Sequence, residues 1–69
     1  MSAFDPARLA DFRKRAGLSQ RALARKAGVA QSVIAGLERG KHTPSETSLG
    51  KLANALGISP SDLSPINPN

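Results

Sequence analysis

The chain has 69 residues, a length that accommodates one domain with a modest hydrophobic core. It contains no cysteine, which excludes disulfides and thiolate metal sites, and no apolar run reaches the roughly 18 residues of a membrane span. The N-terminal sequence lacks the basic-then-apolar layout of a signal peptide, so we expect a cytoplasmic protein.

Positive charge is concentrated in the first two thirds of the chain. The net charge is +5, but the segment from Arg8 to Lys41 holds nine cationic and two acidic residues, a net charge of +7, against −2 for the rest. A surface of this kind attracts a polyanion, and we expect nucleic acid rather than a membrane. Charge alone leaves open a solvated basic surface without a partner.

Five short helices are predicted from start and stop signals that recur along the chain. In chain order they span about Pro6–Ala16, Gln20–Ala27, Gln31–Arg39, Glu46–Leu56 and Pro60–Leu63. The residues at their N-cap positions are Asp5, Ser19, Ala30, Ser45 and Ser59, and all but the alanine can accept a hydrogen bond from the first helical turn. The glycines expected to end the first four helices in left-handed backbone are Gly17, Gly28, Gly40 and Gly57.

Apolar residues recur at helical spacing and predict the core. The expected core residues are Leu9, Phe12, Ala16, Leu23, Ala27, Val29, Ile34, Leu37, Leu49, Leu52, Ala53, Leu56, Ile58 and Leu63. No segment shows strand-like alternation. We therefore predict an all-α domain over residues 1–64, followed by a loose tail at 65–69 that lacks helical periodicity.

The second and third predicted helices stand close together in the stretch GLSQRALARKAGVAQSVIAGLERG, residues 17–40, with Gly28 between them. Two short helices joined in this way are typical of a helix-turn-helix, whose second helix can lie in the major groove of DNA. The same stretch is strongly basic, so the pattern and the charge point to one partner, double-stranded DNA.

An ordered set of residues resembles the phage-repressor and Cro type of helix-turn-helix, the Xre family, between Leu9 and Leu63. The set comprises Arg13 four residues before Gly17, Gly17-Leu18-Ser19-Gln20, Leu23-Ala24, Ala27-Gly28-Val29, Ile34, Leu37-Glu38-Arg39-Gly40-Lys41, Pro44 and Leu52-Ala53-Ala55-Leu56-Gly57-Ile58. The resemblance implies a compact five-helix, lambda-repressor-like domain that binds DNA. The residues themselves point to no cofactor, metal or small-molecule ligand.

The resemblance assigns DNA base contacts to Gln31, Ser32, Val33 and Gly36 in the predicted recognition helix. A glutamine can pair bidentately with adenine, and a serine can donate to or accept from several bases. Val33 either touches a thymine methyl group or packs partly into the core. For Gly36 two readings stay open: the helix backbone approaches DNA closely, or the position is unused.

Phosphate contacts are expected from Gln20, Arg21, Arg39, Gly40, Lys41 and Thr43. Gln20 opens a helix whose free backbone N–H groups favour an anion, and its side-chain amide can add a donor. Arg21 is either a phosphate contact or a solvated cation that the helix dipole disfavours.

Two further assignments concern scaffold and loop. Arg13 and Glu38 resemble a structural ion pair of the family that ties the first helix to the end of the third. His42 is the only histidine, which argues against a metal site, and we expect a loop residue near the DNA backbone.

The predicted function is sequence-specific regulation of transcription, as a repressor bound to a palindromic operator. A homodimer is expected, at least on DNA, because one small domain reads few base pairs and dimerisation doubles the site; its interface is expected near Pro60–Leu63. No nucleophile and base stand at a spacing that predicts an enzyme. An antitoxin or protein-interaction module with the same fold, and a basic protein that coats DNA regardless of sequence, are the alternatives.

Overall fold

The computed structural model describes residues 4–63, which form four α-helices followed by one turn of 3₁₀ helix. The elements are α1 (Pro6–Arg15), α2 (Gln20–Ala27), α3 (Gln31–Glu38), α4 (Glu46–Leu56) and η1 (Pro60–Leu63). The all-α prediction is confirmed, and every predicted boundary lies within one residue of the observed one. The tail at 65–69 lies outside the described residues, so the predicted domain boundary stays a prediction.

The predicted fifth α-helix is a 3₁₀ turn. The Asp62 amide donates to the Ser59 carbonyl at 2.9 Å, which is a bond between residues three apart. The Asp62 carboxylate in turn accepts a 3.0 Å hydrogen bond from the Ser59 amide. A four-residue segment offers little room for the four-apart bonds of an α-helix, so the tighter form is adopted.

Capping residues set the helix boundaries. The side chains of Asp5, Ser19 and Ser45 accept backbone hydrogen bonds of 3.0, 3.0 and 3.1 Å from the first turns of α1, α2 and α4. Ala30 has the same extended backbone conformation at the start of α3, but its side chain makes no capping bond. Gly28 ends α2 in the left-handed region, with φ of 75°.

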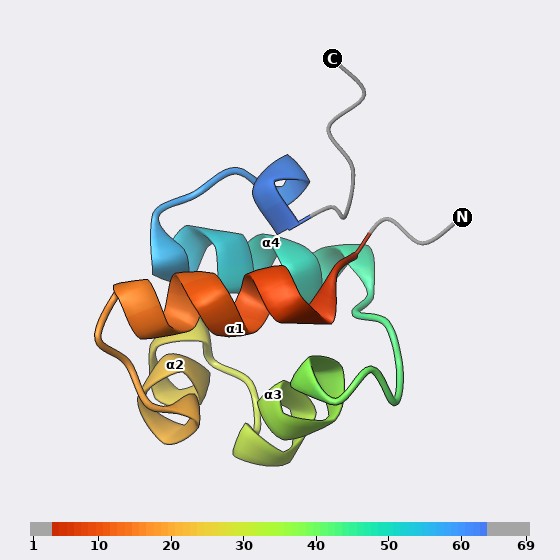
Figure 1. Ribbon diagram of the computed structural model, residues 1–69, viewed down its shortest axis with the longest axis horizontal. Coiled ribbons are helices and arrows are strands. Elements are labelled where there is room, and N and C mark those ends of the chain that lie inside the picture. The colour runs from red at the N-terminus through yellow and green to blue at the C-terminus, as the bar shows by residue number, and fades with distance from the viewer. Residues whose placement is uncertain (1–3, 64–69) are drawn as a thin grey trace.

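The helices lie on two sides of α1, which crosses the front of the molecule in Figure 1. Below it, α2 and α3 lie side by side, while α4 and η1 lie above it (Figure 1). The two ends of the described chain are joined, because the Asp5 amide donates to the Leu63 carbonyl at 2.7 Å. This arrangement leaves α2 and α3 together at one end of the molecule.

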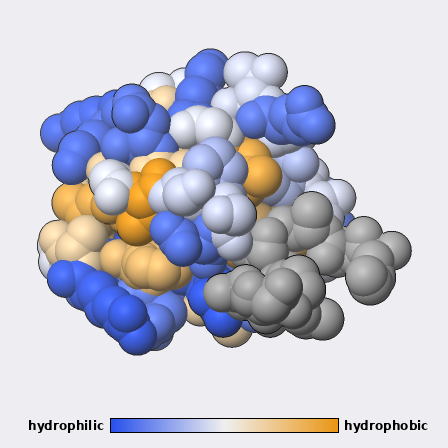
Figure 2. All heavy atoms as spheres, turned by 90° about the horizontal axis from the view of Figure 1, so that it is seen from above, coloured by the Kyte–Doolittle hydropathy of each residue, from blue (hydrophilic) through white to orange (hydrophobic). Residues whose placement is uncertain are grey.

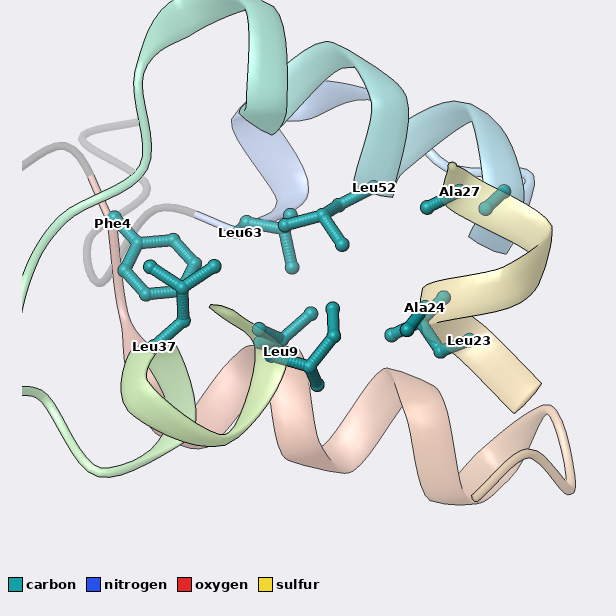
Figure 3. Packing of buried hydrophobic residues seen from close by; sticks show 10 residues of the cluster. Phe4, Leu9, Leu23, Ala24, Ala27, Leu37, Leu52 and Leu63 are labelled. Carbon is teal, nitrogen blue, oxygen red and sulfur yellow. The ribbon is translucent and has the colours of Figure 1, made fainter. Parts of the chain in front are cut away.

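Apolar side chains from every element meet in one core between the helices (Figure 3). The predicted core residues that have no exposed surface are Leu9, Leu23, Ile34, Leu37, Leu52 and Leu63. One core prediction is wrong: Ala16 is exposed, because α1 ends at Arg15 and residue 16 is only its C-cap. Phe4, Ala24 and Ala55 are buried although the spacing did not predict them.

No helix within residues 4–63 is both long enough and apolar enough to cross a membrane.

Candidate nucleic-acid interface

A tight turn fixes α3 against α2. The amides of Gly28 and Val29 both donate to the Ala24 carbonyl, at 2.9 and 3.0 Å, so the chain reverses directly after α2. Fully buried Leu23 on α2 and Ile34 on α3 then hold the two helices against the common core. Two short helices packed in this way across a tight turn form a helix-turn-helix.

The first turn of α3 presents polar side chains to solvent. Gln31 and Ser32 are exposed, whereas Ile34 and Leu37 of the same helix are fully buried in the core. Val33 is partly buried and packs against the core. Three of the four residues expected to contact bases therefore retain accessible surface, and two of them offer polar groups.

Gly36, the fourth residue of that set, is buried. A Cβ atom built on it would lie 2.5 Å from Cε1 of His42, so the imidazole occupies the space beside the glycine. The chain returns over α3 because the Gly40 amide donates to the Leu37 carbonyl at 3.1 Å and the Lys41 amide to the Gly36 carbonyl at 3.0 Å. Neither of the two sequence-based interpretations of Gly36 predicted that the His42 side chain would lie over it.

The candidate phosphate-contacting side chains surround α2 and the end of α3. Arg21 is exposed on the first turn of α2 and lines a shallow depression of about 410 Å³ with Ser19, Ala22 and Arg25. The candidates that follow α3 are all exposed: Arg39, Gly40, Lys41 and Thr43. Exposed cations thus lie on α2 and in the segment that follows α3.

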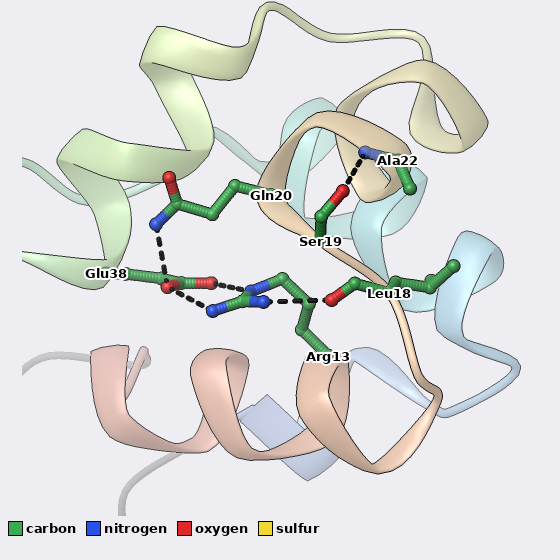
Figure 4. Close-up of polar contacts among 6 residues, drawn as sticks. All are labelled: Arg13, Leu18, Ser19, Gln20, Ala22 and Glu38. Carbon is green, nitrogen blue, oxygen red and sulfur yellow. Dashed lines mark hydrogen bonds and ion pairs between the residues drawn. The ribbon is translucent and has the colours of Figure 1, made fainter.

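Arg13, Gln20 and Glu38 join α1, α2 and α3 through one carboxylate (Figure 4). Arg13 Nε lies 2.6 Å from Glu38 Oε2, and Arg13 Nη2 donates to Oε1 at 3.1 Å. The Gln20 amide donates to the same Oε1 at 3.0 Å. Arg13 also donates to the Leu18 carbonyl at 2.8 Å, which anchors the loop before α2.

The position of the Gln20 side chain differs from the sequence-based expectation. Its amide was expected to donate to a phosphate, but it is turned inward to Glu38. The physical reason is the Glu38 carboxylate, a charged acceptor whose Oε1 takes hydrogen bonds from both Arg13 and Gln20. The free backbone N–H groups at the start of α2 remain the feature of this turn that favours an anion.

The cluster is held in its ionised form. Burial raises the pKa of the Glu38 carboxyl, but hydrogen bonds from Arg13 and Gln20 and the charges of Arg13 and Lys14 lower it further, so the net pKa lies below the ordinary value. The hydrogen bond to Glu38 raises the pKa of Arg13 against the opposing effect of burial. With side chains only 12% and 9% exposed, this pair belongs to the scaffold that orients α3.

No group of three potential metal ligands lies together within residues 4–63.

The family described as helix-turn-helix matches residues 9–63 of the chain. The chain belongs to the helix-turn-helix family. This confirms the resemblance to the phage-repressor and Cro type, and proteins of this family bind DNA and are not enzymes.

Relatives of this helix-turn-helix protein are named as transcriptional regulators. A Sinorhizobium fredii protein named as an uncharacterized HTH-type transcriptional regulator is 38% identical over 50 residues, 72% of this chain and 65% of that protein, just under two thirds of its length. A Bacillus subtilis regulator of the same description, YazB, is 34% identical over 58 residues, 84% of each chain.

Two solved structures share the fold. The restriction-modification controller protein C.AhdI from Aeromonas hydrophila superposes with a TM-score of 0.81 at 41% identity, covering 84% of this chain and 88% of that one. The DNA-binding domain of the P22 C2 repressor superposes with a TM-score of 0.80 at 32% identity, covering 97% and 96%. The predicted lambda-repressor-like architecture is therefore confirmed.

Proposed function

We propose that this helix-turn-helix protein is a cytoplasmic, sequence-specific transcriptional repressor that binds a palindromic operator as a homodimer. The observation that supports it most directly is the outer surface of α3, where Gln31 and Ser32 are exposed on a helix held in place by buried Ile34 and Leu37. A recognition helix meets base edges with its N-terminal residues, which is where these polar side chains stand.

Base reading is assigned to the first turn of α3. Gln31 pairs with an adenine through its amide, and Ser32 donates to or accepts from a neighbouring base. The accessible part of Val33 contacts a thymine methyl group. A good bidentate pair, such as that of Gln31 with adenine, contributes about 1–3 kcal/mol of discrimination against a wrong base.

Affinity and register come from the exposed groups around the motif. The proposed phosphate contacts are the backbone N–H groups at the start of α2 around Gln20, the Arg21 side chain, and the segment after α3 with Arg39, Gly40, Lys41 and Thr43. Contacts of this kind position the protein on the duplex without reading sequence, and they weaken as the salt concentration rises.

Dimerisation is assigned to the surface around α4 and η1. Figure 2 views the protein from this side and shows hydrophobic residues at the surface among hydrophilic ones. Leu49, Leu56 and Ile58 contribute to the region, since each is only partly buried against the core. A modest apolar surface suits a dimer that forms chiefly when two copies occupy one operator.

Selection of duplexes from a random pool with the purified protein, followed by footprinting and measurement of stoichiometry, tests the proposal. We expect two protomers on one site, with half-site centres about 34–36 Å apart, or 10–10.5 base pairs. Tight binding of one protomer to one unpaired half-site would refute the dimer. Failure to enrich any sequence would refute operator recognition.

A further inference from the structure

We propose that the His42 imidazole takes the place of the side chain that Gly36 lacks and donates a hydrogen bond to a purine in the major groove. This inference rests on the proposed function, because it adds a specificity-determining contact to the same recognition helix. It differs from the sequence-based expectation, which placed His42 near the DNA backbone.

Gly36 lies on the outward side of α3. Successive residues of an α-helix are about 100° apart around its axis, so Gly36 is about 160° from buried Ile34 and about 40° from exposed Ser32. A glycine in that position would be open to solvent, yet it is buried. Some other part of the chain must therefore cover it.

The cover is the imidazole of His42. The three atoms nearest to a Cβ built on Gly36 are Cε1, Nε2 and Nδ1 of that ring, at 2.5, 3.1 and 3.4 Å. The ring is brought there by the backbone, because the Lys41 amide is bonded to the Gly36 carbonyl at 3.0 Å and His42 follows directly. The ring fits against α3 only because residue 36 has no side chain.

The placement gives α3 a third polar group beside Gln31 and Ser32. His42 is exposed, and within residues 4–63 no hydrogen bond or ion pair engages its imidazole. An imidazole always carries at least one N–H donor, and purines present N7, with O6 in guanine, as acceptors in the major groove. Since the ring shares the outward side of α3 with Ser32, it faces base edges.

A double-mutant cycle tests the inference with His42→Ala, Gly36→Ala and the combined variant. The Gly36→Ala methyl group collides with the end of an exposed side chain, so it displaces the ring with little strain in the fold. Gly50→Ala is the matched control, because Gly50 lies inside α4 and a Cβ there meets nothing within 4 Å. Thermal unfolding of all variants verifies that each one folds.

Affinity is measured on the duplex selected by the wild-type protein and on a random-sequence duplex. We expect His42→Ala and Gly36→Ala each to weaken binding to the selected duplex about 5- to 50-fold and to change the preferred base at one position. On the random duplex the loss stays below about twofold, and Gly50→Ala changes neither affinity. The combined variant binds no worse than His42→Ala, because the two substitutions remove the same contact.

Three results would overturn the inference. Equal losses on both duplexes would make His42 a phosphate contact, and additive losses would show that it acts without Gly36. Unchanged affinity and base preference in His42→Ala would remove the contact altogether. Failure of the proposed function is distinguishable, since the wild-type protein would then select no preferred duplex at all.

Discussion

Glu38→Gln probes how much the carboxylate at the end of α3 stabilises the fold. The substitution keeps the shape of the side chain but removes the charge that accepts two hydrogen bonds from Arg13 and one from Gln20. It leaves a guanidinium that is 12% exposed without its anionic partner. Removing one member of a buried pair is costly because the other charge stays desolvated.

The stability that Glu38→Gln should lose follows from the burial of the Arg13–Glu38 ion pair. Breaking a fully buried ion pair costs about 3–5 kcal/mol, and a neutral amide still accepts one hydrogen bond, so we expect about 2–3 kcal/mol here. A chain of this length has a free energy of unfolding of about 3.5–10 kcal/mol at typical stability per residue. At about 4–8 °C per kcal/mol, the melting temperature should fall by about 8–24 °C.

Chemical denaturation and thermal unfolding measure the effect, with Asp11→Asn as the control. Asp11 pairs with Arg15 on the surface of α1, Oδ2 to Nη2 at 2.9 Å, but these side chains are 55% and 70% exposed. The control should lose no more than about 0.5 kcal/mol. If Glu38→Gln lowered the free energy of unfolding by no more than Asp11→Asn does, Glu38 would not hold the three helices together.

The pH dependence of the free energy of unfolding should show the contribution of the Glu38 carboxylate. Because the pKa of Glu38 is lowered in the folded state, this contribution is complete above the ordinary pKa of 4.5. It is lost as the pH falls through the lowered pKa of the folded state. The stability gap between wild type and Glu38→Gln should therefore narrow in acid, and a gap that widened there would contradict the sign. Ala30→Ser should stabilise the protein by about 0.5–2 kcal/mol in denaturant titrations, because it supplies the missing N-cap oxygen of α3; no gain would mean that the first turn cannot reach it. Leu52→Ala should lower the free energy of unfolding by about 2–5 kcal/mol, since Leu52 is fully buried, and a loss below about 1 kcal/mol would place it outside the core.

The helices were predictable because their boundaries are encoded locally. Asp5, Ser19 and Ser45 act as side-chain caps as expected, and the glycines end helices in left-handed backbone. The burial of Ala24 and Ala55 was harder to foresee, because small residues add little to an apolar pattern although closely packed short helices enclose them.

The interface was predictable only in part, because its polar contacts join distant residues. The position of Gln31 and Ser32 follows from the helix start, which is a local signal. The hydrogen bond from Gln20 to Glu38 depends on how α2 and α3 pack. The position of the His42 ring beside Gly36 depends on the turn after α3. In the sequence, the one indication that the chain folds back over α3 is a glycine inside the helix, Gly36, followed by a glycine in the next turn, Gly40.

The most direct test of the proposed recognition surface compares Gln31→Ala with Lys41→Ala on the selected and the random duplex at two salt concentrations. Gln31→Ala should lose about 1–3 kcal/mol on the selected duplex alone. Lys41→Ala should weaken binding to both duplexes alike and reduce the salt slope by about one. Indistinguishable effects of the two substitutions on both duplexes would contradict sequence reading by the first turn of α3.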